Sequence, residues 1–429
     1  MEEKIFDQLE EKLYKETLAN GLQVYVIPKA GFHKTFASFT TNYGSIDNHF
    51  TPIGKNEEVK VPDGIAHFLE HKMFEDEKGD VFQTFGEQGA AANAFTSFTK
   101  TAYLFSSTSN TDENITTLLD FVQHPYFTAE SVEKEKGIIE QEISMYDDNP
   151  DWQLFFNLLG SMYANHPVKI DIAGTADSIY EITKDDLYEC YNTFYHPSNM
   201  IFFVTGDADP EHIIDLVKRN QEQKTFKEPE DIKRFLQTEP EEVVTAKKVV
   251  KMSVNTPKCL VGFKLKASDL NGREMLEYEL KMQLLLDALF GAGSDLYEEL
   301  YEEGLIDDSF SIDISVERSF SFVAAGGDTP DPDQLEKKLT DAFASAMEKG
   351  VDDENFERVR KKKIGNFLKQ LNSPEFIANQ FTSCAFHNVH LFDTIPILES
   401  LTVEDINKQL QNHFSEKSRS VSQVIKKEA

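Results

Sequence analysis

Residues 182–187 read ITKDDL, and residues 401–406, which begin 219 positions later, read LTVEDI. In both stretches a threonine precedes acidic residues, the pattern of an N-cap that begins a helix. A second, weaker similarity links residues 128–143 with residues 352–367, at an offset of 224. Amphipathic helices also resemble one another by chance. Two similarities at nearly the same long offset nevertheless favour an internal duplication, so we predict two related halves.

Strand-like and helix-like patterns alternate along the chain, which indicates an α/β or α+β fold. Residues 223–243 are rich in charge and contain two prolines, so they are interpreted as a linker. The predicted domains are therefore 1–222 and 244–429, joined by 223–243. Strands are expected at 21–28, 36–43, 102–106 and 201–205, a loop at 46–63, and helices from Gly64 onward and at 112–123, 130–146 and 183–195.

Composition excludes several classes of function. The 43 basic and 75 acidic residues of this 429-residue chain give a net charge of −32, which argues against nucleic acid as a ligand. The longest apolar runs are strand-sized, so no membrane span is expected. Three cysteines without a CxxC motif suit a reducing compartment. The acidic N-terminal stretch lacks the features of a signal peptide. We predict a soluble cytoplasmic protein.

The chemistry is concentrated in residues 67–71, which read HFLEH. On a helix, His67 and His71 lie one turn apart on the same face, where two neutral imidazoles can hold a divalent ion such as zinc. Glu70 leans toward the same site, and a carboxylate beside zinc-bound water can act as a general base. This order inverts the HExxH motif. The alternative is a surface helix with scattered polar residues, or a structural histidine.

A third protein ligand is expected on the helix at 130–146. At about 100° per residue, Glu135 and Glu142 fall within the apolar stripe that contains Ile138, whereas Glu133 and Glu140 fall on the opposite face. Carboxylates on a buried face require a cation. Either Glu142 or Glu135 should therefore be the ligand, with the other supporting it. The alternative is a partly exposed helix whose glutamates reach solvent.

With these motifs identified, the chain resembles the pitrilysin/insulinase family of inverzincin zinc metallopeptidases over nearly its whole length. The resemblance is nearest to the YmfH-like bacterial branch, which is associated with 5-aminopentanol modification of elongation factor P. It implies an α+β fold of two homologous half-domains, each a mostly antiparallel sheet packed with helices. The segments that carry the resemblance are NGLQVYVIP, DGIAHFLEHKMF, AANAFTSFTKTAYLFSST, EKEKGIIEQEI and the stretch from HPVKIDIAGT to MIFFVTGD.

The resemblance implies a role for each site residue. His67, His71 and Glu142 match the zinc ligands, Glu70 matches the general base, and Glu135 matches the supporting carboxylate. Asn93 and Ala94 match an edge-strand segment that pairs with the substrate backbone, and strand addition suits an extended peptide. The alternative for Asn93 is a turn residue.

The second half departs from the metal-binding pattern. No histidine lies between residues 213 and 386, and at the offset of 224 Glu142 becomes Asn366 and Glu135 becomes Val359. Family members often carry an Arg–Tyr pair in this half that clamps the substrate carbonyl. Here Tyr301 stands in place of the arginine, and Asp308 or Ser309 in place of the tyrosine, unless residues such as Arg318 substitute. Because an oxyanion needs donors besides zinc, a second subunit is expected to supply them.

We therefore expect a Zn²⁺-dependent endopeptidase that hydrolyses short unfolded peptides in a closed chamber. The expected partner is a metal-free paralogous subunit, and a homodimer is the alternative. Two rival functions are a non-catalytic structural subunit and a partner subunit in a modification pathway of the elongation factor P type. The intact HFLEH motif disfavours the first rival.

Overall fold

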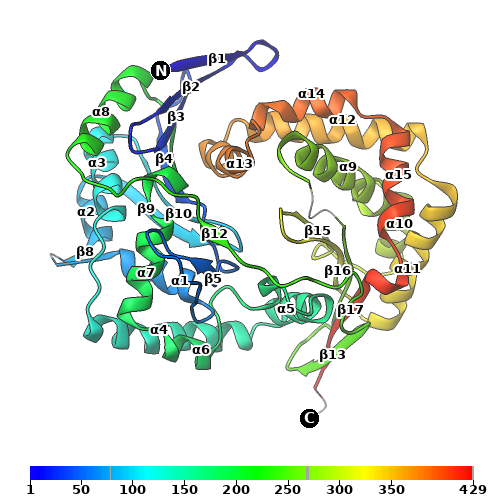
Figure 1. Ribbon diagram of the computed structural model, residues 1–429. Coiled ribbons are helices and arrows are strands. Elements are labelled where there is room, and N and C mark those ends of the chain that lie inside the picture. The colour runs from blue at the N-terminus through cyan, green and yellow to red at the C-terminus, as the bar shows by residue number, and fades with distance from the viewer. Residues whose placement is uncertain (78, 267–269, 428–429) are drawn as a thin grey trace. The chain divides into compact units, whose positions relative to one another are not determined.

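The computed structural model describes residues 1–77, 79–266 and 270–427. The chain forms two compact units, whose elements are labelled in Figure 1. Neither unit is continuous in sequence. Unit 1 comprises Met1–Ile143, Asp171–Leu236 and Leu371–Phe386, and unit 2 comprises Ser144–Ile170, Gln237–Gln370 and His387–Ala429.

Unit 1 contains a seven-stranded sheet in which only β3 and β11 pair in parallel. Every residue of the neighbouring strands β4 and β11 is buried, as expected for a sheet covered on both faces. In spatial order the strands are β1 (Glu2–Phe6), β2 (Glu11–Thr17), β3 (Gln23–Pro28), β11 (Met200–Gly206), β4 (Thr35–Thr41), β10 (Thr101–Ser107) and β9 (Ala90–Thr96).

The four helices predicted in unit 1 are confirmed as α1, α3, α4 and α7, and further helices accompany them. Together the helices are α1 (Ile65–Met73), α2 (Val81–Glu87), α3 (Thr111–Val122), α4 (Ala129–Asp147, whose last residues belong to unit 2), α6 (Ala176–Glu181), α7 (Lys184–Phe194), α8 (Pro210–Glu222) and α13 (Pro374–Phe386). Short strands complete the unit: β5 (His49–Thr51), β6 (Val59–Lys60), β7 (Glu75–Asp76), β8 (Gly79–Asp80) and β12 (Lys233–Arg234). The stretch 46–63, predicted to be a loop, therefore also contains β5 and β6.

Unit 2 contains a five-stranded sheet, in the order β13 (Lys247–Met252), β17 (Arg419–Lys426), β14 (Lys258–Lys264), β16 (Ser321–Asp328) and β15 (Ser311–Val316). Its helices are α5 (Pro150–Met162), α9 (Gly272–Phe290), α10 (Asp295–Glu302), α11 (Pro332–Lys349), α12 (Asp353–Gln370), α14 (Thr394–Ser400) and α15 (Val403–His413). Among the described residues, no helix of either unit is long and apolar enough to cross a membrane.

The two sheets repeat one topology. In unit 2, β13 and β17 are parallel and the remaining pairs are antiparallel, which reproduces the order and directions of β3-β11-β4-β10-β9 in unit 1. Thr183 and Thr402 both close capping boxes at the starts of α7 and α15, as the two repeated motifs predicted. The α+β fold with two mostly antiparallel halves is thereby confirmed.

Each unit contains one helix from the other half of the sequence. α5 packs against β14 and β17 of unit 2, and α13 packs against β4 and β11 of unit 1. Gly262 in β14 permits the close approach of α5, because a Cβ there would lie 2.3 Å from the terminal methyl of Met162. The division into 1–222, 223–243 and 244–429 describes homologous stretches of chain and stays a prediction, whereas the compact units exchange helices across it.

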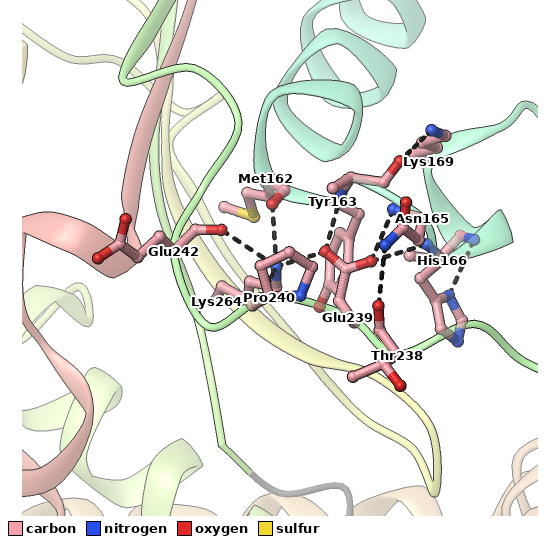
Figure 2. Close-up of polar contacts among 12 residues, drawn as sticks. Met162, Tyr163, Asn165, His166, Lys169, Thr238, Glu239, Pro240, Glu242 and Lys264 are labelled. Atoms are coloured by element: carbon pink, nitrogen blue, oxygen red, sulfur yellow. Dashed lines mark hydrogen bonds and ion pairs between the residues drawn. The ribbon is translucent and has the colours of Figure 1, made fainter.

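The predicted linker is bound at both of its ends. In unit 1, Arg234 donates to Asp47 at 2.6 Å and β12 pairs with β5. In unit 2, Glu239 accepts hydrogen bonds of 2.8 Å from the backbone N–H groups of residues 164–166 (Figure 2). Buried Lys264 donates to Glu239 and to the Pro240 carbonyl, both at 2.6 Å. These bonds order a stretch whose composition alone indicated a flexible connection.

Candidate metal centre

Helix α1 begins at a tightly packed glycine and presents its two histidines on one side. Gly64 has a φ of +87°, and a Cβ there would lie 2.3 Å from the carbonyl oxygen of Ala173, so only glycine fits. Ile65, Phe68, Leu69 and Met73 are buried by the packing of the helix. This packing places the His67 and His71 rings side by side, with their centroids 4.5 Å apart.

A glutamate of α4 completes the group. Nε2 of His67 lies 3.6 Å from Oε1 of Glu142, and Nε2 of His71 lies 3.5 Å from Oε2 of the same carboxylate. One donor atom from each residue lies within 4.8 Å of the other two, and within the described part of the chain this is the one such group of three or more. Two imidazoles and a carboxylate that leave a fourth position open are the donor set of a catalytic zinc site, so these residues fit that ion.

The helical angles correctly predicted that Glu135 lies on the buried face of α4. They were partly wrong about which apolar residues share that face. Glu135 is 5% exposed, and Val132, Ile139 and Ile143 are buried as predicted. Ile138, however, is 46% exposed. The buried face of α4 is therefore centred on Val132, Ile139 and Ile143, and Ile138 lies outside it.

Glu135 contacts the ring nitrogen of His71 that faces away from Glu142. Its Oε1 lies 3.0 Å from Nδ1 of His71, whose Nε2 faces Glu142. A hydrogen bond at Nδ1 assigns the proton to that nitrogen and leaves Nε2 free to bind a metal. The two glutamates that the helical angles could not rank thus occupy different positions: Glu142 faces both Nε2 atoms, and Glu135 contacts Nδ1 on the far side of the His71 ring.

Burial and neighbouring charges set the protonation of the centre. Burial, reinforced by His71, lowers the pKa of His67 to about 4, so this ring is neutral near pH 7. Burial acts in the same direction on His71, but the bond to Glu135 and the nearby carboxylates outweigh it and raise its pKa. Burial opposes ionisation of Glu135, yet its partner His71 and Lys72 hold its pKa below the usual value. The site therefore carries an ionised carboxylate against His71 and a neutral imidazole at His67.

Glu70 is buried at 8% exposure and faces the sheet edge. Its Oε2 accepts a 2.6 Å hydrogen bond from the hydroxyl of Thr96, which lies at the end of β9. Burial raises the pKa of Glu70, and the Thr96 bond partly offsets the effect. Thr96 was missed by the sequence interpretation, although it lies within the AANAFTSFT segment that was singled out.

Asn93 and Ala94 lie in β9, the strand at one edge of the seven-stranded sheet. They pair with Leu104 and Tyr103 of β10 on the inner side. Asn93 is thus a strand residue rather than a turn residue, and its side-chain oxygen accepts from the backbone N–H of Ala94 at 2.9 Å. The edge and the metal centre are connected through Thr96 and Glu70.

Two stretches of the chain match known protein-family domains. Residues 51–176, which contain the whole centre, match the insulinase (peptidase family M16) domain, and residues 181–363 match the peptidase M16 inactive domain. A Bacillus subtilis protein named "uncharacterized zinc protease YmfH" is 58% identical over 422 residues, which cover 98% of each chain. The protein belongs to peptidase family M16.

Two further relatives agree with this assignment. A crystal structure of an M16-like peptidase from Alicyclobacillus acidocaldarius superposes with a TM-score of 0.94 at 41% identity and covers 97% of this chain and 99% of that one. Zinc protease PqqE of Helicobacter pylori is 25% identical over 388 residues, covering 87% of this chain and 83% of its own. The M16 assignment and these zinc protease relatives support a metallopeptidase.

The second half of this M16 protein lacks the centre's side chains. α12 begins 224 residues after α4 (353 − 129), so Val359 and Asn366 take the positions of Glu135 and Glu142. α9, at the predicted place of the second HxxEH-like helix, contains no histidine. Tyr301 is 52% exposed on α10, and Asp308 and Ser309 precede β15. These features agree with the match to an M16 inactive domain.

Proposed function

We propose that this M16 protein is a zinc-dependent endopeptidase that hydrolyses short unfolded peptides. The observation that carries the proposal is the convergence of His67, His71 and Glu142 within 4.8 Å, with buried Glu70 on the same helix. His67 and His71 would hold the ion through Nε2, and Glu142 would hold it through its carboxylate. When bound, zinc supplies Lewis acidity and a water whose pKa is lowered to near 7.

The chain's own residues perform the proton transfers and the positioning. Glu70 accepts a proton at its carboxylate and later delivers it to the leaving amine, and Thr96 fixes the orientation of that carboxylate through the 2.6 Å bond. The outer edge of β9 offers backbone N–H and C=O groups to an extended peptide, with Asn93 and Ala94 in the middle of the strand. An unfolded peptide is favoured because only an extended backbone can add to a strand edge.

A second subunit belongs to the same proposal. A transition-state oxyanion requires hydrogen-bond donors besides the metal, and Tyr301 and Asp308 or Ser309 stand where an arginine and a tyrosine would supply them. We propose that a metal-free paralogous chain, or a second copy of this chain, supplies these donors and closes a chamber that limits substrate size. The cytoplasm remains the proposed compartment.

The test is Glu70→Gln, assayed for zinc content and for cleavage of a fluorogenic peptide panel. The variant should retain zinc and lose roughly 10²- to 10⁴-fold in kcat, because general acid–base catalysis contributes about that much. Glu140→Gln, on the α4 side where Glu140 accepts from Tyr180, is the matched control and should keep full activity. Full activity of Glu70→Gln, or wild-type protein that binds no zinc, would refute the proposal.

The presence of Tyr301 and of Asp308 or Ser309 where an Arg–Tyr pair is expected also favours a second candidate function, that of a partner subunit in a modification pathway without proteolysis. The same assay separates the two functions when it is run with and without a protein captured from the source cell. Zinc-loaded protein that cleaves no peptide in either condition would support the second candidate.

A further inference from the structure

Lys72 is a buried charge that neither the family match nor the proposed chemistry uses. It follows His71 on α1 and is 0% exposed. Its ammonium bonds Glu75, lies 3.4 Å from the carbonyl oxygen of Ser131, and lies 3.9 Å from Oε2 of Glu135. Burying an ammonium group is costly unless carboxylates and hydrogen-bond acceptors compensate it.

Two consecutive residues of α1 therefore face the two oxygens of one carboxylate, His71 through a hydrogen bond and Lys72 at ion-pair distance. His71 contacts Oε1 of Glu135 at 3.0 Å, and Lys72 approaches Oε2 at 3.9 Å. Glu75 is 39% exposed, so solvent can stabilise its charge, whereas the Glu135 side chain is 7% exposed and depends on these neighbours. The positive charge of Lys72 thus helps to compensate a carboxylate that cannot easily be hydrated, and its attraction favours the orientation with Oε2 toward the lysine.

We propose that Lys72 is a positioning residue of the metal centre that acts through Glu135. By holding Oε2, the ammonium keeps Oε1 directed at Nδ1–H of His71, which fixes the ring with Nε2 toward Glu142. This inference rests on the proposed zinc function, because the orientation of His71 matters only if Nε2 binds an ion. The Lys72 ammonium contacts Glu75, Ser131 and Glu135, none of which is a proposed metal ligand or the proposed base, so its role is one of positioning.

The chain offers a closely matched control in Lys136 of α4. Lys136 is also buried, at 5% exposure, and it also bonds a glutamate three positions away and a backbone carbonyl. Its partners are Glu133 at 2.6 Å and the carbonyl of Tyr180 at 3.0 Å. Lys136→Met therefore removes a buried ammonium group whose partners are of the same kinds as those of Lys72. Its hydrogen bonds go to Glu133 and Tyr180 and not to Glu135.

The experiment measures the zinc dissociation constant of the full chain by chelator competition, in a double-mutant cycle with Glu135→Gln. Outer partners of metal ligands typically contribute 10- to 100-fold, so Lys72→Met should weaken zinc binding about tenfold. Lys136→Met should leave it unchanged. In the Glu135→Gln background, Lys72→Met should have little further effect, because the carboxylate through which it acts is gone. The Co²⁺ absorption spectrum should change in Lys72→Met and not in Lys136→Met.

Three outcomes would overturn the inference: unchanged or tighter zinc binding in Lys72→Met, an equal loss in Lys136→Met, or an additive loss in the double variant. If Lys72→Met fails to fold, the double variant Lys72→Met/Glu135→Gln is compared with Glu135→Gln alone. A much weaker zinc affinity in the double variant would then overturn the inference. Wild-type protein that binds no zinc would remove the proposed function as well. Zinc binding without peptidase activity would remove that function alone.

Discussion

One separable contribution to the pH dependence of unit 2 should come from the buried histidine His166. This residue is 2% exposed, and its Nδ1 accepts from the backbone N–H of Val168 at 3.1 Å. Burial lowers the pKa of His166 to about 4, and Lys264 acts in the same direction against the opposing effect of Glu239. The unfolded chain binds a proton at this histidine near its ordinary pKa, about 6.5.

The effect of His166 on the free energy of unfolding follows from the difference between its pKa values in the folded and unfolded chain. Because the folded pKa is depressed, the contribution of His166 to stability is fully present above about pH 6.5 and is lost as pH falls toward 4. A difference of about 2.5 pKa units corresponds to about 3 kcal/mol, of which about 2 kcal/mol is lost by pH 5. Glu239 acts at lower pH. Lys264 and backbone N–H bonds outweigh its burial and hold its pKa low, so its contribution is lost as pH falls through that lowered value.

The assay is urea unfolding at several pH values between 7.5 and 4.5, followed by tryptophan fluorescence. Trp152, the single tryptophan, lies in α5 and stacks on Tyr146 within unit 2, so the signal reports this unit. A chelator in every sample removes any contribution from metal loss. His166→Asn keeps a side-chain acceptor for Val168 but has no titratable group, so its stability should fall less between pH 6.5 and 4.5. Parallel pH curves for the two proteins would refute the reasoning.

Two further comparisons test the metal centre and the packing of the exchanged helix. Glu142→Ala should abolish tight zinc binding while Glu140→Ala retains it, measured by metal analysis after dialysis; equal retention would contradict the assignment of the third ligand. Gly262→Ala should destabilise unit 2 by about 1–3 kcal/mol through overpacking against Met162 of α5. Gly365→Ala, in α12 with nothing within 4 Å of the added methyl, should instead stabilise by up to about 1 kcal/mol in the same urea assay, so a loss there would show that the Gly262 effect is not specific.

Local periodicity explains which parts of the site were predictable. His67, Glu70 and His71 lie within one turn, so helix geometry alone placed them together. Glu135 was identified because a carboxylate on a buried helical face needs a cation, and its burial bears this out, whereas the Glu142 side chain is 22% exposed and lies at the margin of that face. Thr96 could not be found in this way, because its bond to Glu70 joins a strand end to a helix and has no period in the sequence.

The fold was predictable where the repeated motifs mark it and unpredictable where tertiary packing decides. The threonine caps and the similarity of residues 128–143 to residues 352–367 indicated two related halves. The exchange of α5 and α13 left no sequence signal, since an amphipathic helix does not specify which sheet it covers. Lys72 shows the same limit, because a lysine is expected at the surface unless its partners are known.

The duplication also shows why the carboxylate at Glu135 requires explanation. Its counterpart in unit 2, Val359, is 1% exposed, and Glu135 is 5% exposed, so this position is buried in both halves. The common topology therefore imposes burial, whichever side chain the position carries. A valine meets that condition without cost, whereas a carboxylate meets it only beside His71, Lys72 and, in the proposed function, the ion that His71 holds. The more costly residue occurs in the half that has the two histidines, which indicates that chemistry rather than stability selects it.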